Sequence, residues 1–198
     1  MSYAGKGMFA AALLAVGSAQ CALPDLLETD RPHNFHVVDA GRVYRSAQPT
    51  AGELEAVIDV LGIRTVLNLR GPNAGKAWYD VEAAICAEKD VRLVDVALSA
   101  RWLPPPDRLA EVIDALKTAE YPMLIHCNGG ADRTGMVSAV YRMTILGHER
   151  AAALEELSPE FLHFRQWNPC MDTLAELYEP TPEWLEWYRA HSEEIACQ

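Results

Sequence analysis

The chain has 198 residues, of which 50% are apolar and 23% are charged, and its formal net charge is −11. This length supports one domain with a substantial core, and the composition argues against a disordered chain. A strongly acidic surface repels nucleic acids and anionic lipids, so a nucleic-acid partner is not expected. The sequence leaves the oligomeric state open.

Residues 1–19 have the layout of a secretory signal peptide. Lys6 precedes an uncharged apolar stretch from Met8 to Val16, and three small residues follow it. This stretch is shorter than the roughly 20 residues that a membrane-spanning helix needs, so stable membrane insertion is not expected. The layout predicts cleavage after Ala19 and export to the periplasm. A helix at the uncleaved N-terminus of a cytoplasmic protein is the alternative. Residues 20–33 then form a linker.

The five cysteines do not indicate a metal site. No C-x-x-C pair is present and the six histidines are scattered, so a structural zinc site is improbable. Cys86 falls on the apolar side of a helical pattern and is expected to be a small buried side chain. If the protein is exported, a disulfide between Cys170 and Cys197 is compatible with the sequence.

Strands and helices alternate along the rest of the chain. Two short strands are expected within 35–46 and single strands at 63–70, 91–98 and 121–127; helices are expected at 50–62, 78–89, 106–117, 133–147, 149–157 and 181–195. This order predicts an α/β fold, with a central, mostly parallel twisted sheet of four to five strands and helices on both faces. Residues 34–198 form one domain, with 160–198 as a C-terminal helical extension. In the helix at 78–89, the spacing places Val81, Ala84 and Ile85 inward.

The stretch HCNGGADRTG, residues 126–135, joins the last expected strand to a helix. In parallel α/β sheets ligands bind beyond the carboxyl ends of the strands, which is where this stretch lies. Backbone N–H groups of such a loop and the N-terminus of the next helix form an anion site, and the same field stabilises a thiolate at Cys127. Gly129 and Gly130 are expected to let the backbone turn inward. The planar fork of Arg133 matches two oxygens of a phosphoryl group.

Other residues of the stretch extend the expected site. Thr134 places a hydroxyl close enough to donate to the sulfur, and the ring of His126 is expected to orient the loop. A Walker-type loop is excluded, because no lysine precedes Thr134. The expected phosphate-binding set is the backbone of Asn128, Gly129, Gly130, Ala131, Asp132 and Arg133.

The pattern H-C-x-x-G-x-x-R-T resembles the signature loop of the cysteine-dependent phosphatases, in the dual-specificity and tyrosine phosphatase group. VYRSAQP (43–49) resembles the opening segment of the bacterial members, and GIRTVLNLR (62–70) resembles the strand that follows it. ALSARWLPPP (97–106) lies where that family carries a movable acid loop. The resemblance covers roughly residues 34–160 and implies the cysteine-phosphatase fold there.

The same resemblance implies a two-step hydrolysis. The Cys127 thiolate attacks a phosphate ester and forms a phosphocysteine, while Arg133 and the backbone N–H groups hold the equatorial oxygens. A water molecule then cleaves the intermediate, and Thr134 helps the sulfur to leave. This mechanism requires neither a metal nor a cofactor. The expected partner of the protein is a phosphorylated protein or a small phosphate ester.

The general acid for the leaving group is the open point. Many family members have an aspartate in the loop after the strand at 91–98, where this chain has SARWLPPPD. Asp107 lies there, but at a helix start, where an acidic residue is favourable in any case. Some relatives with the sequence DRTG use its aspartate as the acid, which ranks Asp132 ahead of Asp107. Arg45 and Arg101 are expected to flank the pocket as surface residues, where arginines usually have no catalytic role.

These residues predict a phosphoric monoester hydrolase, in the first place a protein tyrosine or dual-specificity phosphatase. An inositol-phosphate or phospholipid phosphatase of the same superfamily is the alternative, although Asn128 and Ala131 stand where such enzymes often carry lysines. A phosphate-binding pseudophosphatase is disfavoured because Cys127 and Arg133 are both present. A sulfurtransferase is disfavoured because the C-x5-R spacing and the Thr134 hydroxyl suit phosphate better.

Overall fold

The computed structural model of the protein describes residues 30–197. The predicted signal peptide at 1–19 and most of the predicted linker at 20–33 lie outside the described residues. None of the helices within 30–197 is both long and apolar enough to cross a bilayer.

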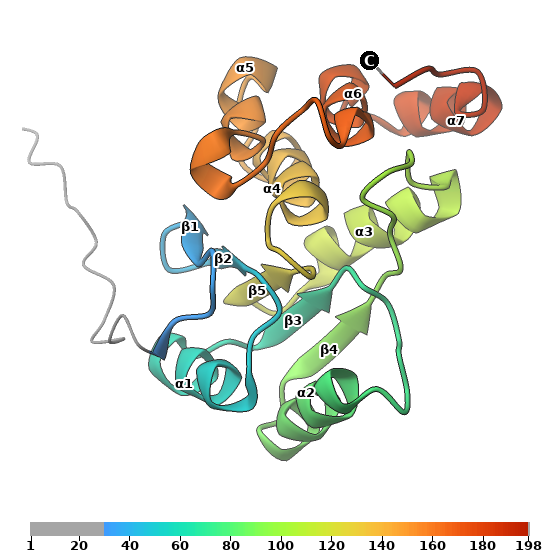
Figure 1. The fold of residues 1–198 in the computed structure, drawn as a ribbon. Helices are drawn as coiled ribbons and strands as arrows, with labels where there is room; N and C mark the ends of the chain where they lie inside the picture. The colour runs from blue at the N-terminus through green and yellow to red at the C-terminus, as the bar shows by residue number, and fades with distance from the viewer. Residues whose placement is uncertain (1–29, 198) are drawn as a thin grey trace, which may run out of the picture.

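Five strands form one sheet in the order β1-β2-β5-β3-β4 (Figure 1). Only β1 is antiparallel to its neighbour, and β2, β5, β3 and β4 run parallel to one another. The predicted α/β fold with a mostly parallel sheet is therefore confirmed. The strands are β1 (His36–Asp39), β2 (Val43–Ser46), β3 (Thr65–Asn68), β4 (Arg92–Asp95) and β5 (Met123–His126).

Helices cover both faces of the sheet (Figure 1). On one face, α1 (Ala51–Leu61) and α2 (Ala77–Glu88) enclose an apolar core that includes Val66 and Leu124. On the other face, α3 (Pro106–Thr118) and α4 (Asp132–Thr144) pack over a larger core. The remaining helical segments are α5 (Arg150–Ala153), η2 (Leu154–Glu156), η3 (Pro159–Phe161), α6 (Pro169–Leu177) and α7 (Pro182–His191).

Local chemistry sets several of these boundaries. The side chain of Thr50 accepts from the backbone N–H of Glu53, whose carboxylate accepts from the N–H of Thr50, so α1 begins with a capping box. Gly62 ends α1 in the left-handed conformation, with φ of 66°. Thr181 caps α7 in the same way as Thr50 caps α1, through its side-chain oxygen.

The predicted inward face of α2 is wrong by about one position. Val81 is 43% exposed and Ala84 is also exposed. The buried residues are Glu82, Ile85 and Cys86. A buried carboxylate breaks the apolar pattern, and Glu82 is inside because it has polar partners there, described below.

The C-terminal region is helical, as predicted, but α6 has no counterpart among the expected helices. α6 packs against α4, and α7 packs against α3. A disulfide joins Cys170 at the start of α6 to Cys197, with the two Cα atoms 4.7 Å apart. The structure therefore contains the disulfide that the sequence allowed. The helix expected at 149–157 is α5 followed by the 3-10 helix η2.

Candidate active site

The stretch 126–135 lies at the carboxyl edge of the sheet. The central strand β5 ends at His126, which is aligned with Ser46 of β2 and Asn68 of β3. Cys127 follows directly and is 2% exposed. α4 begins at Asp132, so only four residues separate the thiol from a helix N-terminus. The structure thus places Cys127 where ligands bind in sheets of this type.

Two glycines permit close backbone contacts at this loop. Gly130 has a φ of 67°, and a Cβ atom there would lie 2.5 Å from the backbone of Ala47. Gly135, in the first turn of α4, lets that helix approach the carbonyl oxygen of Glu156, which a Cβ would meet at 2.6 Å. Gly129 was expected to share this role but has open space around it and no positive φ.

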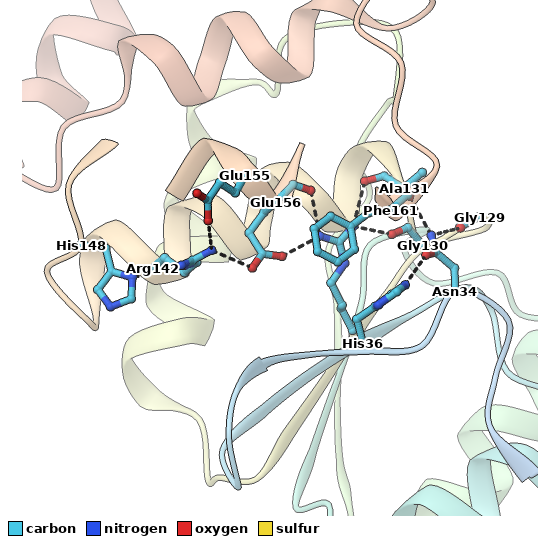
Figure 2. A network of polar contacts seen from close by, with 11 residues as sticks. Asn34, His36, Gly129, Gly130, Ala131, Arg142, His148, Glu155, Glu156 and Phe161 are labelled. Carbon is cyan, nitrogen blue, oxygen red and sulfur yellow. Dashed lines mark hydrogen bonds and ion pairs between the residues drawn. The ribbon is translucent and has the colours of Figure 1, made fainter. Parts of the chain in front are cut away.

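Arg45 was expected at the surface and is instead completely buried beneath the loop. Its Nη2 donates to the carbonyl oxygens of Gly130 at 2.7 Å and Ala131 at 3.3 Å. Its Nη1 donates to the carbonyl oxygen of Glu156 at 2.8 Å and to its carboxylate at 2.7 Å. Figure 2 shows these partners together with Phe161, whose ring centre is 4.3 Å from the guanidinium carbon. A buried cation needs this degree of pairing.

Four successive carbonyl groups of the loop are bound on its outer side. Besides the two bonds from Arg45, Asn34 Nδ2 donates to Gly129 O at 3.0 Å (Figure 2). The backbone N–H of Gln48 donates to Asn128 O at 3.2 Å. In a planar trans peptide, each C=O points away from the N–H that follows it. The N–H groups of residues 129–132 are therefore directed away from these partners, which is the arrangement of an anion cradle.

The guanidinium of Arg133 has one bound nitrogen and one unpaired nitrogen among the described residues. Its Nη1 donates to the carbonyl oxygens of Leu69 and Leu98, each at 3.3 Å. Its Nε is buried and has no hydrogen-bond partner among the described residues. A buried unpaired donor is costly, so this edge of the guanidinium is suited to an anion. The hydroxyl of Thr134 is also buried and unpaired within residues 30–197.

Arg70 adds a second guanidinium near the thiol, although it was not among the expected site residues. Its Nη1 donates to Gln48 Oε1 at 2.9 Å, and its guanidinium lies 3.5 Å from the ring centre of Trp78. Burial and the neighbouring charge of Arg133 lower the pKa of Arg70, against the opposing effect of Glu82 and Cys127. By contrast, Arg101 is exposed and lines a cavity beside the Cys170–Cys197 disulfide.

His126 is buried between the loop and α2. Its Nε2 lies 2.8 Å from Glu82 Oε1, close enough for an ion pair but outside hydrogen-bonding alignment. Its Nδ1 is 3.4 Å from the carbonyl oxygen of Cys127. Glu82 also accepts from Gln48 Nε2 at 3.2 Å. These contacts explain why Glu82 is turned inward on α2.

The two candidate acids lie in different surroundings. Asp132 is the first residue of α4, and its Oδ1 lies 2.8 Å from Nδ1 of His163. The other ring nitrogen of His163, Nε2, lies 2.8 Å from Oδ2 of Asp172. The side chain of Asp107 is 81% exposed at the start of α3 and forms an ion pair with Arg189. Asp132 is thus part of the loop, whereas the ion pair of Asp107 joins it to α7.

Comparison with known proteins fits this geometry. A family described as "DSP-PTPase phosphatase fused to NAD+ Kinase" matches residues 27–167, which is more than half of the chain. The chain belongs to this family. Its match includes every residue of the signature loop.

Two curated proteins are similar to this chain in sequence. The dual specificity protein phosphatase TpbA of Pseudomonas aeruginosa is 32% identical over 117 residues, which are 58% of this chain and 49% of TpbA. The inositol diphosphatase DSP1 of Oryza sativa subsp. japonica is 33% identical over 116 residues, which are 56% of this chain and 50% of DSP1. The chain therefore spans about half the length of each relative.

The fold agrees with that of a solved phosphatase structure. The core catalytic domain of the PP-IP phosphatase SIW14 from S. cerevisiae superposes with a TM-score of 0.64 at 22% identity. The superposition covers 83% of this chain and 94% of that domain. The cysteine-phosphatase fold predicted from the DSP-PTPase motifs is thus supported by structure as well as by sequence.

Proposed function

We propose that this chain hydrolyses phosphate monoesters through a phosphocysteine on Cys127, with phosphotyrosine and other phosphorylated protein side chains as its substrates. The observation that carries the proposal is the outward binding of four loop carbonyls beside a buried cysteine. This arrangement directs N–H groups and the free edge of Arg133 toward one anion. The expected transition state spreads negative charge over the equatorial oxygens that such donors hold.

The proposed reaction proceeds in two steps and needs neither a metal nor a cofactor. In the first step the sulfur of Cys127 forms a bond to phosphorus, the ester P–O bond breaks, and a general acid protonates the leaving oxygen. In the second step water attacks phosphorus, the S–P bond breaks, and the acid recovers its proton from that water. The thiolate and inorganic phosphate are the products. Asp132 is proposed as the acid, because it belongs to the loop itself.

An inositol-phosphate substrate is the second candidate. Arg70 is held near the loop by Gln48 and Trp78, so a second guanidinium is available for a second phosphate group. The names of DSP1 and SIW14 point to substrates of that class in those proteins. TpbA, named a dual specificity protein phosphatase, supports the first candidate.

A side-by-side assay tests the substrate class. Phosphate release is measured from a phosphotyrosine peptide, a phosphothreonine peptide and an inositol phosphate at equal concentrations. We expect the phosphotyrosine peptide to give the highest kcat/KM. The opposite order, with the inositol phosphate fastest and dependent on Arg70, would transfer the proposal to the second candidate. An Arg70→Gln variant supplies that comparison.

The choice between the two acids gives a second expected result. Asp132→Asn should lower kcat by about 10²-fold or more for an alkyl phosphate, whose leaving group needs a proton, and far less for p-nitrophenyl phosphate. Asp107→Asn should leave both rates near wild type, because Asp107 is exposed and paired with Arg189. Steady-state kinetics with the two substrates measures both effects. A large loss in Asp107→Asn with a normal Asp132→Asn would reverse the assignment.

A further inference from the structure

We infer that His163 is a positioning residue for the phosphoryl transfer: it holds Asp132 in place as the general acid and is itself held by Asp172. The inference rests on the proposed function and deepens it. It adds two residues outside the signature loop to the machinery of the reaction. His163 lies in the segment after η3, and Asp172 lies in α6.

The geometry commits both ring nitrogens of His163. Nδ1 is 2.8 Å from Asp132 Oδ1, and Nε2 is 2.8 Å from Asp172 Oδ2. The His163 side chain is fully buried, whereas that of Asp132 is 24% exposed. Within the part of the chain that the structure describes, Asp132 Oδ2 has no hydrogen-bond partner. One oxygen of Asp132 is therefore bound from inside the protein, which leaves Oδ2 to meet the leaving oxygen in the proposed reaction.

The segment that carries His163 is attached to the loop. Asn34 Nδ2 donates to both Gly129 O at 3.0 Å and Phe161 O at 2.9 Å (Figure 2). Phe161 also packs on the guanidinium of Arg45, which binds two further loop carbonyls. The backbone N–H of His163 donates to Ser158 O at 3.2 Å. The segment that carries His163 and the loop are thus joined through Asn34 and Arg45.

Asp172 fixes the ring from the opposite side. It is 7% exposed and belongs to α6, which packs against α4, the helix that begins with Asp132. The three side chains therefore connect two packed helices through the segment between them. A carboxylate that accepts from Nε2 fixes the orientation of the ring, so that Nδ1 is presented to Asp132.

The charge of His163 suits this role. Burial favours the neutral ring, but the hydrogen bonds to Asp132 and Asp172 outweigh it and raise the pKa of His163 to about 9. With Asp132 and Asp172 both ionised, the ring is an imidazolium near neutral pH and donates from both nitrogens. This cation stabilises the ionised form of Asp132, which is the form left once Asp132 has given its proton to the leaving oxygen. A preorganised charge of this kind stabilises the transition state without rearrangement.

Two substitutions of His163 separate positioning from packing. The amide nitrogen of an asparagine reaches the place of Nδ1, so His163→Asn keeps a donor for Asp132. The amide of a glutamine reaches the place of Nε2, so His163→Gln keeps only the contact to Asp172. We expect His163→Gln to lower kcat for an alkyl phosphate by about 10- to 100-fold, with KM little changed. His163→Asn should be about ten times faster than His163→Gln, and p-nitrophenyl phosphate should be slowed less than about 3-fold by either variant.

A double variant and a structural control complete the experiment. Asp132→Asn combined with His163→Gln should be no slower than Asp132→Asn alone, because the second residue acts through the first. Tyr178→Phe removes a 2.7 Å hydrogen bond to Thr144 at the end of α6, away from the loop, and should retain wild-type kinetics. Thermal unfolding of every variant shows how much of any loss comes from the fold.

The outcomes distinguish this inference from the proposed function. If the wild-type protein does not hydrolyse phosphomonoesters through Cys127, both fail. If it does, but His163→Gln slows the two substrates equally, or its effect adds fully to that of Asp132→Asn, only the positioning role is overturned. The same holds if His163→Gln and Tyr178→Phe have equal kinetics. A selective, non-additive loss that His163→Asn partly restores supports the role.

Discussion

Replacing Cys127 with serine is expected to abolish turnover of an aryl phosphate, by about 10⁴-fold or more, while inorganic phosphate still binds. A serine hydroxyl is a far weaker nucleophile than a thiolate, but the phosphate cradle is made of backbone groups and Arg133, which the substitution leaves in place. Turnover is measured by phosphate release and binding by isothermal titration calorimetry.

The other free cysteine supplies the control for this substitution. Cys86 is buried in α2 and belongs to the core that includes Val66 and Leu124, whereas Cys127 belongs to the other core. Cys86→Ser should lower stability modestly and keep the turnover of the folded protein. Undiminished activity in Cys127→Ser would overturn the phosphocysteine mechanism. Equal loss in both variants would point to unfolding instead of loss of the nucleophile.

Arg45→Met should be the most destabilising single substitution around the loop, at about 3–5 kcal/mol. The substitution leaves the buried Glu156 carboxylate with Arg142, at 3.2 Å, as its one remaining ion-pair partner within residues 30–197, and it removes the donors to Gly130 O and Ala131 O. For a chain of this size such a loss lowers the melting temperature by roughly 10 °C. Urea or thermal unfolding gives the stability, and phosphate titration reports whether the loop keeps its shape.

Arg64→Met is the matched comparison for that result. Arg64 forms an ion pair with Glu120 at 3.2 Å, but both side chains are more than half exposed. Exposed pairs contribute at most about 1 kcal/mol, so Arg64→Met should unfold close to wild type. If Arg45→Met proves as stable as Arg64→Met, the buried guanidinium does not support the loop.

The parts of the site that are contiguous in sequence were predictable. Cys127, Arg133 and Asp132 lie within seven residues, and the alternating strands and helices placed that stretch at the carboxyl edge of a sheet. The expected α/β architecture depends on apolar periodicity, which is a local property. This local pattern was sufficient to predict every strand of the sheet.

The supporting contacts were not predictable, because each joins distant residues. Arg45 meets Glu156 across 111 positions, and His163 meets Asp132 across 31. A polar residue is normally expected outside, and only its partner in the fold explains its burial. Glu82 illustrates the error. The apolar pattern predicts an inward face of α2 that is one position away from the observed face, because no residue of that helix indicates that Glu82 contacts His126.

The C-terminal extension of the domain contributes side chains to the candidate site. The residues after 160, expected as a helical extension, contain His163 and Asp172 and lie against the loop through α6 and α4. The match to the family ends at residue 167, five residues before Asp172. A chain cut at 160 would keep every residue of the signature motif and lose the two side chains behind its aspartate. The smallest unit that holds the whole arrangement therefore extends through α6, beyond the part that the motif alone would define.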